Sequence, residues 1–349
     1  MLAYSYKKYG TPDVLEKIQL PVPTPKPNEV LIRIYATTVS AGDWRARSLT
    51  MPKGLGLMGR LVFGINGPRK PILGTEFSGV IEAIGAEVTG YQTGDAVIGF
   101  PGAGFGGHAE FITMPLDGKL ALKPDNISFE QAAAIPFGAT TAYDFLVNKA
   151  KLQSGETVLI NGASGSVGSA CVQIAKHLGA HVTAICSGKN ADMVRALGAD
   201  RVIDYRMQNV IEADVEYDMV VDTVATLPWV QAQHAIRRGG RMVLIAGKTS
   251  DMLLGSLKAC LKGKKMVGGV ASERPEILAA VVKLAGQGVL QPVIDRSYAF
   301  DDMKAAHSHV DTGHKKGNVV VSVWSGSEAH NQTRLLHDAA QPTRALSSP

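Results

Sequence analysis

One short segment restricts the fold more than any other feature of the chain. The apolar run TVLIN leads directly into GASGSVG, where Gly162, Gly165 and Gly168 stand three residues apart before a helical pattern. Glycine allows a tight turn and close approach of the backbone to a pyrophosphate, and the helix N-terminus presents free N–H groups to an anion. The segment therefore predicts a dinucleotide-binding turn, with Ser164 and Ser166 as further contacts. The alternative is a structural turn in an α/β domain.

The surrounding sequence alternates between strands and helices. From about residue 129 to 272, the apolar runs TVLIN, HVTAIC, RVIDY, YDMVVD, RMVLIA and KMVGGV are separated by helical patterns such as VGSACVQIAKHL, ADMVRALG and PWVQAQHAIRR. Such runs are typical of buried parallel strands with crossover helices, so a doubly wound sheet is predicted. Residues 1–127 instead contain strand-like segments separated by proline and glycine. The last apolar run, NVVVSVW, is expected to return to this first part.

Composition narrows the class of protein. The 349 residues carry 36 basic and 31 acidic side chains, and the mild excess is spread along the chain, which argues against nucleic-acid binding. The three cysteines form no CxxC pair, and the first residues show no targeting pattern. No apolar run reaches the roughly 18 residues that a membrane span needs. We therefore expect a cytoplasmic protein with no nucleic-acid partner and no membrane insertion.

The residues after the second apolar run indicate which dinucleotide binds. A carboxylate at this point bonds the ribose 2′-hydroxyl of NAD and repels the 2′-phosphate of NADP. HVTAIC is followed by Ser187, Gly188 and Lys189, and no Asp or Glu occurs from Ser169 through Ala191. A hydroxyl and an ammonium favour a phosphate through charge-assisted hydrogen bonds. The sequence therefore predicts NADPH, and the alternative is that Lys189 is an ordinary solvated loop lysine.

Three segments together resemble the medium-chain dehydrogenase/reductase superfamily: NGASGSVGSACVQIAKHLGAHVTAICSGKN, GTEFSGVIEAIG and GHKKGNVVVSV. Over about residues 3–324 the chain looks like the zinc-independent quinone oxidoreductase (zeta-crystallin-like) branch. The resemblance implies an α/β fold with a GroES-like, β-rich catalytic domain at 1–128 and 273–324 and a Rossmann NADP-binding domain at 129–272. It also implies a homodimer, often formed by edge-to-edge continuation of the Rossmann sheets. Residues 325–349 lack periodicity and are expected to be a disordered tail.

The same resemblance implies individual cofactor contacts. Ser187 and Lys189 match the family's contacts to the 2′-phosphate, and Tyr205 matches a tyrosine that lies against that phosphate. Val167 matches a backbone donor to the pyrophosphate, and Thr141 matches a threonine beside the nicotinamide. Ala246 and Gly247 match two residues under the nicotinamide ring, and Asn318 matches a cofactor contact near the C-terminus.

The positions that match the zinc ligands of related alcohol dehydrogenases hold other residues. Ser40 stands where those enzymes have their first cysteine, and Thr75 stands where they have histidine. Zinc needs three or four thiolate, imidazole or carboxylate ligands, and two hydroxyls cannot replace them. We expect Glu76 to be a structural hydrogen-bonding or ion-pairing residue and His108 to be a turn histidine. The sequence therefore predicts no metal site.

Without a Lewis acid, the expected acceptor is a conjugated carbonyl. Hydride delivery to a plain ketone creates an alkoxide, whereas a quinone, enone or enal spreads the charge and needs only positioning and a hydrogen bond or two. The candidates are Ser40 as a hydrogen-bond donor, Asp43 as a loop-fixing or proton-relaying group and Trp44 as a pocket wall; Arg45 replaces a tyrosine of some relatives. The alternatives are an NADPH-binding protein with little turnover and an NAD(P)-dependent alcohol dehydrogenase.

The segment MPKGLGLMGRLVFGINGPRK, residues 51–70, is expected to be a long loop. It holds five glycines and four basic residues, and no acid follows until Glu76. A loop of this length is either functional or flexible. It either caps the cleft and offers apolar walls to a hydrophobic acceptor, or it is a packed connector without a substrate role.

Overall fold

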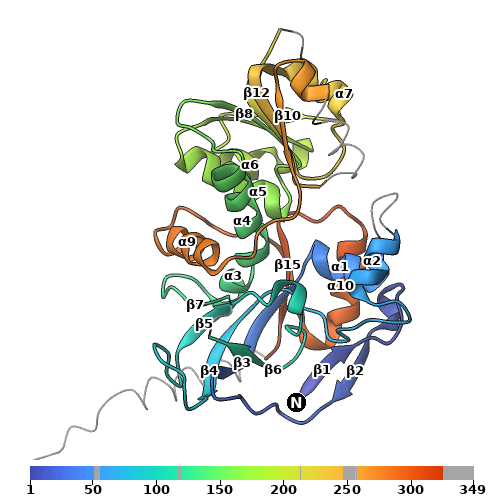
Figure 1. Ribbon diagram of the computed structural model, residues 1–349, viewed down its shortest axis with the longest axis vertical. Coiled ribbons are helices and arrows are strands. Elements are labelled where there is room, and N and C mark those ends of the chain that lie inside the picture. Colours follow the sequence, from blue (N-terminus) through green and yellow to red (C-terminus); the bar gives the residue numbers. More distant parts are fainter. Residues whose placement is uncertain (51–55, 117–118, 213, 247–255, 257, 325–349) are drawn as a thin grey trace, which may run out of the picture.

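A parallel sheet lies at one end of the molecule and a largely antiparallel sheet at the other, with helices between them (Figure 1). This computed structural model describes residues 1–50, 56–116, 119–212, 214–246, 256 and 258–324. The arrangement confirms the predicted α/β class, in which a β-rich GroES-like part accompanies a doubly wound sheet.

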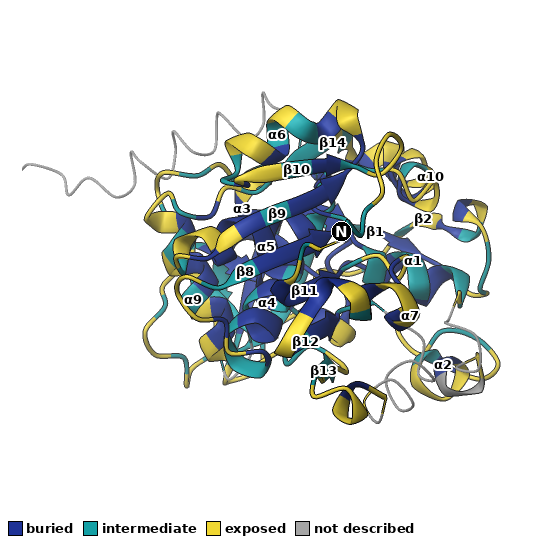
Figure 2. Ribbon diagram, turned by 90° about the horizontal axis from the view of Figure 1, so that it is seen from above, coloured by how far each residue is buried: buried dark blue, intermediate teal, exposed yellow. Residues whose placement is uncertain are grey.

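Within the described residues the parallel sheet has six strands in the order β10–β9–β8–β11–β12–β13, which lie side by side in Figure 2. Counted from β8, this is the 3-2-1-4-5-6 order of dinucleotide-binding folds. The inner strands are apolar because helices cover both faces. The strands are β8 (Thr157–Asn161), β9 (His181–Cys186), β10 (Arg201–Asp204), β11 (Tyr217–Asp222), β12 (Ile236–Leu244) and β13 (Lys265–Gly268).

The helices around this sheet share its hydrophobic core. Buried side chains of α5 and α9 join the same cluster as Val158 and Ile160 of β8, and α9 also lies against α4. The helices are α4 (Pro136–Tyr143), α5 (Ser166–His177), α6 (Ala191–Ala196), α7 (Trp229–Ala232) and α9 (Pro275–Gly286). A π-helical stretch, η3 (Asp144–Lys149), continues α4.

One predicted helix is shorter than its sequence pattern. The pattern PWVQAQHAIRR predicts a helix to its last arginine, but α7 ends at Ala232 and the strand β12 already begins at Ile236. Ile236 is fully buried and pairs with Tyr217 of β11. Pairing and burial of Ile236 in the sheet outweigh the local helical preference of this segment.

The second sheet joins distant parts of the chain. Its order among the described residues is β14–β15–β3–β4–β5–β7, and β6 also pairs with β3. Val319 lies opposite Val39, so the last apolar run returns to the first part of the chain, as predicted. The strands are β3 (Glu29–Val39), β4 (Phe77–Ile84), β5 (Ala96–Gly99), β6 (Phe111–Pro115), β7 (Leu120–Leu122), β14 (Ile294–Ala299) and β15 (Asn318–Ser322). A separate hairpin contains β1 (Leu2–Ser5) and β2 (Glu16–Gln19).

The helices of this second part are α1 (Ala41–Ser48), α2 (Gly56–Phe63), α3 (Phe129–Ala133) and α10 (Met303–Asp311). The helix α2 corrects the prediction of a loop over residues 51–70. Contacts with the rest of the protein fix the C-terminal end of α2. The Phe63 ring lies 6.3 Å from that of Phe105, and the Tyr9 hydroxyl donates to the Gly64 carbonyl at 2.7 Å. These contacts come from distant segments, and the local sequence does not reveal them.

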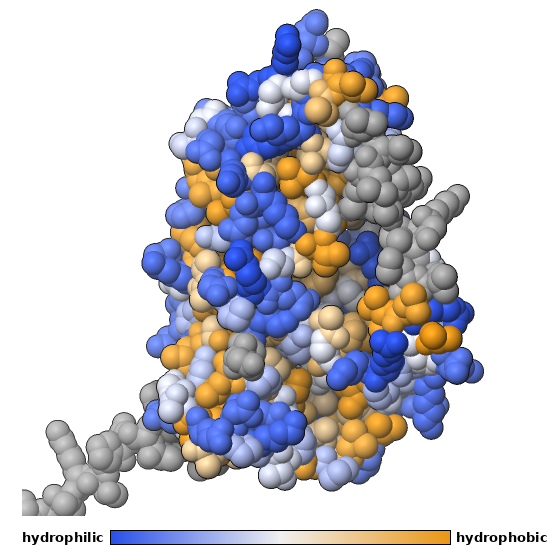
Figure 3. All heavy atoms as spheres, viewed as in Figure 1, coloured by the Kyte–Doolittle hydropathy of each residue, from blue (hydrophilic) through white to orange (hydrophobic). Residues whose placement is uncertain are grey.

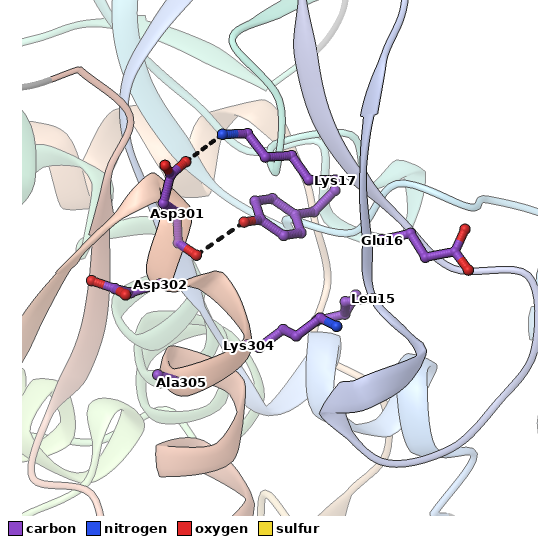
Figure 4. A pocket seen from close by; sticks show the side chains of 8 residues that line it. Leu15, Glu16, Lys17, Asp301, Asp302, Lys304 and Ala305 are labelled. Carbon is purple, nitrogen blue, oxygen red and sulfur yellow. Dashed lines mark hydrogen bonds and ion pairs between the residues drawn. The ribbon is translucent and has the colours of Figure 1, made fainter.

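A hollow lies where the N-terminal hairpin meets α10 (Figure 4). Lys17 forms an ion pair with Asp301 there, and the Tyr4 hydroxyl donates to the Asp301 carbonyl at 3.1 Å. Because these groups bind each other, we interpret the hollow as the junction that fastens the hairpin to the last helix.

Candidate active site

A cavity of about 890 Å³ opens at the carboxyl ends of β8, β9 and β11. Parallel α/β sheets bind ligands at this edge, where the strand order reverses on either side of the first strand. The opposite wall is formed by α1 and by the segment between α10 and β15. The cavity therefore brings residues from both ends of the chain against the predicted dinucleotide turn.

The turn after β8 has the shape that a diphosphate requires. Gly162 has φ +79°, and a Cβ atom on Gly168 would lie 2.1 Å from the Gly162 carbonyl oxygen, so both positions need glycine. Ser166 lines the cavity, but its hydroxyl oxygen is buried: a Cβ on Gly138 of α4 would lie 2.5 Å from it, and it has no hydrogen-bond partner among the described residues. It lies at the first turn of α5, where free N–H groups and the helix dipole favour an anion. These residues fit the pyrophosphate of a dinucleotide.

Gly168→Ala is expected to destabilise the protein by about 1–3 kcal/mol, because the new methyl group meets fixed backbone. Gly165→Ala is the matched control: its Cβ would lie 3.5 Å from the Gly162 carbonyl oxygen, an ordinary contact. Thermal unfolding without cofactor measures the difference. Equal unfolding temperatures for the two variants would contradict the close packing of α5 on the turn.

Two cations flank the cavity after β9 and β10. Ser187 is buried at the end of β9, and Lys189 is exposed on the following 3₁₀ turn; both line the cavity, as does Tyr205. Arg206 also lines it, with its guanidinium 5.8 Å from the centre of the Tyr205 ring. The sequence analysis did not identify Arg206 as a cofactor contact, although it directly follows Tyr205, which was predicted to lie against the 2′-phosphate.

A carboxylate lies behind this cationic edge, which the sequence analysis did not anticipate. A Cβ on Gly188 would lie 2.4 Å from Asp204 Oδ2, so Asp204 of β10 packs against the turn after β9. Its other oxygen accepts a hydrogen bond from the Arg206 backbone N–H at 3.0 Å. Asp204 does not line the cavity, and it holds the backbone that presents Arg206.

The segment before β15 supplies a further cation, Lys315, which sequence reasoning also missed. The Gly317 N–H donates to the Ser164 carbonyl at 2.8 Å, which fixes this segment to the glycine turn. The Lys315 ammonium donates to the Gly317 carbonyl at 2.5 Å and lines the cavity. Burial lowers the pKa of Lys315 to about 8, while Glu76 and Asp295 oppose that shift.

Of the other predicted cofactor contacts, some line the cavity and one does not. Asn318 and Ala246 line the cavity, and the Asn318 amide donates to the Val293 carbonyl at 3.1 Å. Val167 also lines the cavity. Thr141 does not: it lies in α4, and its hydroxyl donates to the Phe137 carbonyl at 2.7 Å. Gly247 lies outside the described residues.

At the opposite end of the cavity a hydrogen-bonded network fixes the start of α1. The Ser40 hydroxyl accepts from the backbone N–H of Gly42 and Asp43 and donates to Asp43 Oδ2 at 2.6 Å. Thr75 donates to the Ser40 oxygen at 2.9 Å, and Asp43 also accepts from the Gly74 N–H. Ser40 lines the cavity, but its proton is directed to Asp43, and Asp43 itself is fully buried. We therefore assign both residues to positioning α1.

Arg45 is the cation nearest this network in sequence. It lines the cavity beside Trp44 and Phe137, and no residue in the described part of the chain forms a hydrogen bond or ion pair with its guanidinium. Burial lowers the pKa of Arg45. An unpaired guanidinium in a cavity wall can bind an oxygen that carries negative charge.

The described residues do not fit the zinc site of related alcohol dehydrogenases. The Ser40 and Thr75 hydroxyls bind each other, and Glu76 is fully buried and accepts from Thr38 and from the Phe137 N–H at 2.6 Å. His108 is also fully buried, in a bend rather than an exposed turn, and its Nε2 donates to the Thr38 carbonyl at 3.0 Å. No described group of three His, Cys, Asp or Glu side chains is arranged to hold a metal ion.

Burial raises the pKa of Glu76 to about 8. In the folded protein Glu76 holds its proton up to that pH, whereas the unfolded chain releases it near its ordinary pKa of 4.5. Since the folded state binds more protons between these values, the free energy of unfolding falls as pH rises from about 4.5 to 8, by about 5 kcal/mol.

Glu76→Gln is expected to remove this part of the pH dependence, because the amide stays neutral and can donate to Thr38 while accepting from Phe137. Denaturant unfolding at pH 5 and pH 8 measures it, and exposed Glu87→Gln is the control. Parallel pH curves for Glu76→Gln and the unchanged chain would contradict the assignment.

The described residues of the segment 56–70 do not line the cavity. The side chains of Leu57 and Met58 lie outside the described part, and Phe63 points toward Phe105. The predicted cleft cap therefore has no support from this segment.

Comparisons with known proteins agree with this geometry. Residues 26–125 match the alcohol dehydrogenase GroES-like domain, and residues 197–321 match the zinc-binding dehydrogenase family. A chloroplastic quinone-oxidoreductase homolog of Spinacia oleracea is 30% identical over 92% of this chain and 98% of its own length. An NADPH-dependent alkenal/one oxidoreductase of Arabidopsis thaliana is 29% identical over 92% of this chain and 79% of its own. The quinone oxidoreductase structure from Coxiella burnetii superposes with a TM-score of 0.80 at 28% identity, covering 93% of this chain and 99% of that one.

Proposed function

The chain belongs to the quinone oxidoreductase-like branch of the medium-chain dehydrogenase/reductase superfamily, and on this premise we propose that it is an NADPH-dependent, metal-independent reductase of quinones, enones or enals. One observation carries the proposal. A single cavity joins a diphosphate-shaped glycine turn, the cations Lys189 and Arg206, and the Arg45 guanidinium, which has no partner among the residues that the structure describes.

The residues that would hold NADPH are distributed along the cavity. Ser187, Lys189, Tyr205 and Arg206 would bind the 2′-phosphate, because two of them are cationic and none of the four is a carboxylate. The glycine turn, the N-terminus of α5 and Lys315 would bind the diphosphate, whose charge they complement. When bound, NADPH supplies the hydride.

The chain's own contribution at the acceptor end is positioning and charge. Ser40, Asp43 and Thr75 hold the start of α1, and Trp44 forms part of the wall. During hydride transfer to a conjugated carbonyl, negative charge develops on its oxygen. The Arg45 guanidinium would bind that oxygen, and the proton that completes the reduction would come from solvent.

A screen of acceptors with both cofactors tests this function. We expect oxidation of NADPH with quinones, enones or enals, and slow oxidation with simple ketones, because the latter do not delocalise the charge. Tight NADPH binding without turnover of any acceptor would instead establish a binding protein. Faster oxidation of simple alcohols with NAD would establish an alcohol dehydrogenase.

We also propose a cytoplasmic homodimer. The strand β13 lies at the edge of the described parallel sheet, and Leu261 and Val270 nearby are largely exposed. Pairing of two β13 strands would cover this edge and the apolar side chains. Light scattering, which measures the mass in solution, tests the dimer, and the mass of a single chain would refute it.

A further inference from the structure

The helix α2 turns apolar side chains to solvent. Leu61 and Val62 of α2 are 49% and 55% exposed, and Ile65 is 57% exposed. Ile65 stands two residues beyond Phe63, the last residue of α2, so all three lie at the C-terminal end of this helix. Figure 3 shows hydrophobic atoms at this side of the molecule beside strongly hydrophilic ones. The opposite side of α2 is already fixed through Phe63 and the Tyr9 contact to Gly64, so rotation of the helix cannot bury the exposed side chains.

Cations surround these apolar side chains. Arg60, Arg69 and Lys70 are exposed on the same segment, and Arg60 donates to the Ile65 carbonyl at 3.0 Å. Arg60 and Arg69 lie close enough to Tyr9 to affect its charge state. Burial raises the pKa of the Tyr9 hydroxyl, and the positive charges of these two arginines oppose that rise.

Two further cations come from the N-terminal segment. A Cβ on Gly67 would lie 3.0 Å from the Lys7 carbonyl, so the exposed residues Lys7 and Lys8 adjoin the loop that follows α2. None of these five cations has an ion pair in the described part of the chain. The sequence from residue 51 to 75 contains no acid.

We propose that this surface, which we call the α2 face, docks the protein onto an anionic lipid bilayer. It consists of Leu61, Val62 and Ile65 with the cations Lys7, Lys8, Arg60, Arg69 and Lys70. Apolar side chains enter the headgroup boundary, while lysine and arginine attract anionic lipid headgroups. The contact is peripheral, since no described helix is long and apolar enough to cross a bilayer.

The positive charge of the α2 face favours an anionic bilayer over a second copy of the chain as its binding partner. Two α2 faces in contact would bring ten cations together with no acid on either face, which is unfavourable. A bilayer provides the opposite charge over a wide area.

The α2 face also lies close in sequence to the cavity, because Thr50 lines its wall and α2 begins at Gly56. Docking at this face would therefore serve a hydrophobic acceptor held in the bilayer. That consequence rests on the proposed function, but docking itself does not.

Sedimentation of the full chain with lipid vesicles tests the proposal without any measurement of enzyme activity. The probes are vesicles of phosphatidylcholine and vesicles that also contain phosphatidylglycerol. We expect binding to the anionic vesicles alone, and loss of most of it when NaCl is raised from about 0.05 to about 0.5 M, because salt screens the headgroup attraction.

Two variants separate the apolar and the charged contributions. K8Q/R69Q/K70Q is expected to weaken binding on the order of 100-fold, and L61S/V62S/I65S at least about 10-fold. The matched controls change exposed residues elsewhere: R238Q/K262Q/K283Q for charge and L122S/V230S for apolar surface. All substituted side chains are exposed, and an unchanged unfolding temperature verifies folding.

Three results would overturn the proposal. The first is no binding to anionic vesicles, and the second is equal loss of binding in the control variants. The third is a dimer that L61S/V62S/I65S dissociates, because a second copy would then cover the α2 face. An inactive protein that still binds anionic vesicles through the α2 face would refute the proposed function and leave the docking surface established.

Discussion

Arg45→Met is expected to lower kcat for quinone and enone reduction by about 100-fold or more, with little change in the Kd for NADPH. Arg45 is the cavity-lining cation beside Trp44 and Phe137, and its guanidinium has no partner within the described residues. Removal of one donor to a developing oxyanion typically costs 10²–10³ in kcat. Among different acceptors, the decrease in kcat caused by Arg45→Met should be larger for those whose carbonyl oxygen develops more negative charge.

Steady-state kinetics and equilibrium NADPH binding measure the two quantities separately. Arg45→Lys is expected to recover part of kcat, since it keeps the charge and loses the planar donor geometry. Exposed Arg274→Met serves as the control for loss of an arginine. A wild-type kcat in Arg45→Met, or a loss confined to NADPH binding, would show that the guanidinium does not act on the acceptor.

The double variant K189A/R206A is expected to weaken NADPH binding roughly 10- to 100-fold and to leave NADH binding nearly unchanged. Both side chains line the cavity after β9 and β10, where the 2′-phosphate would lie, and charge-assisted hydrogen bonds to phosphate account for the effect. Because Lys189 and Arg206 are both exposed, solvent screens their attraction to the phosphate and limits the loss of affinity.

Lys315→Gln is the matched comparison, because Lys315 adjoins the glycine turn and would bind the diphosphate that both cofactors share. It should weaken NADPH and NADH alike, by about 10-fold or more. Because the pKa of Lys315 is about 8, its charge is lost above that pH, and the affinity of the unchanged chain for both cofactors should decline there. Calorimetric titration with each cofactor tests these variants. An equal loss for both cofactors in K189A/R206A would contradict the assignment of the 2′-phosphate site.

The glycine turn could be predicted from sequence because its contacts are local. Gly162, Gly165 and Gly168 act through the conformation and close approach of neighbouring backbone, which their spacing already encodes. Ser187 and Lys189 follow directly from the end of one strand. The residues that sequence reasoning missed are Arg206 and Lys315, which reach the cavity from a neighbouring strand and from a segment about 150 residues after the turn.

One prediction failed for the opposite reason, since distant contacts override a local pattern. The glycines of residues 51–70 favour a loop, but Tyr9 and Phe105 fasten the segment and it forms α2. Ser40 is a different case, because the group that accepts its proton is local: Asp43, three residues later, accepts it within the capping box at the start of α1. A serine followed three residues later by an acid is a capping-box pattern that the sequence already contains.

The most direct measurement is the stoichiometry of the reaction in the presence of a zinc chelator. Purified protein would be incubated anaerobically with NADPH and an enone, and the amounts of oxidised cofactor and reduced product would be compared. We predict equal amounts and a rate that the chelator does not change. Loss of the reaction on chelation, or a faster reaction in a parallel sample that contains NADH in place of NADPH, would contradict a metal-independent NADPH site.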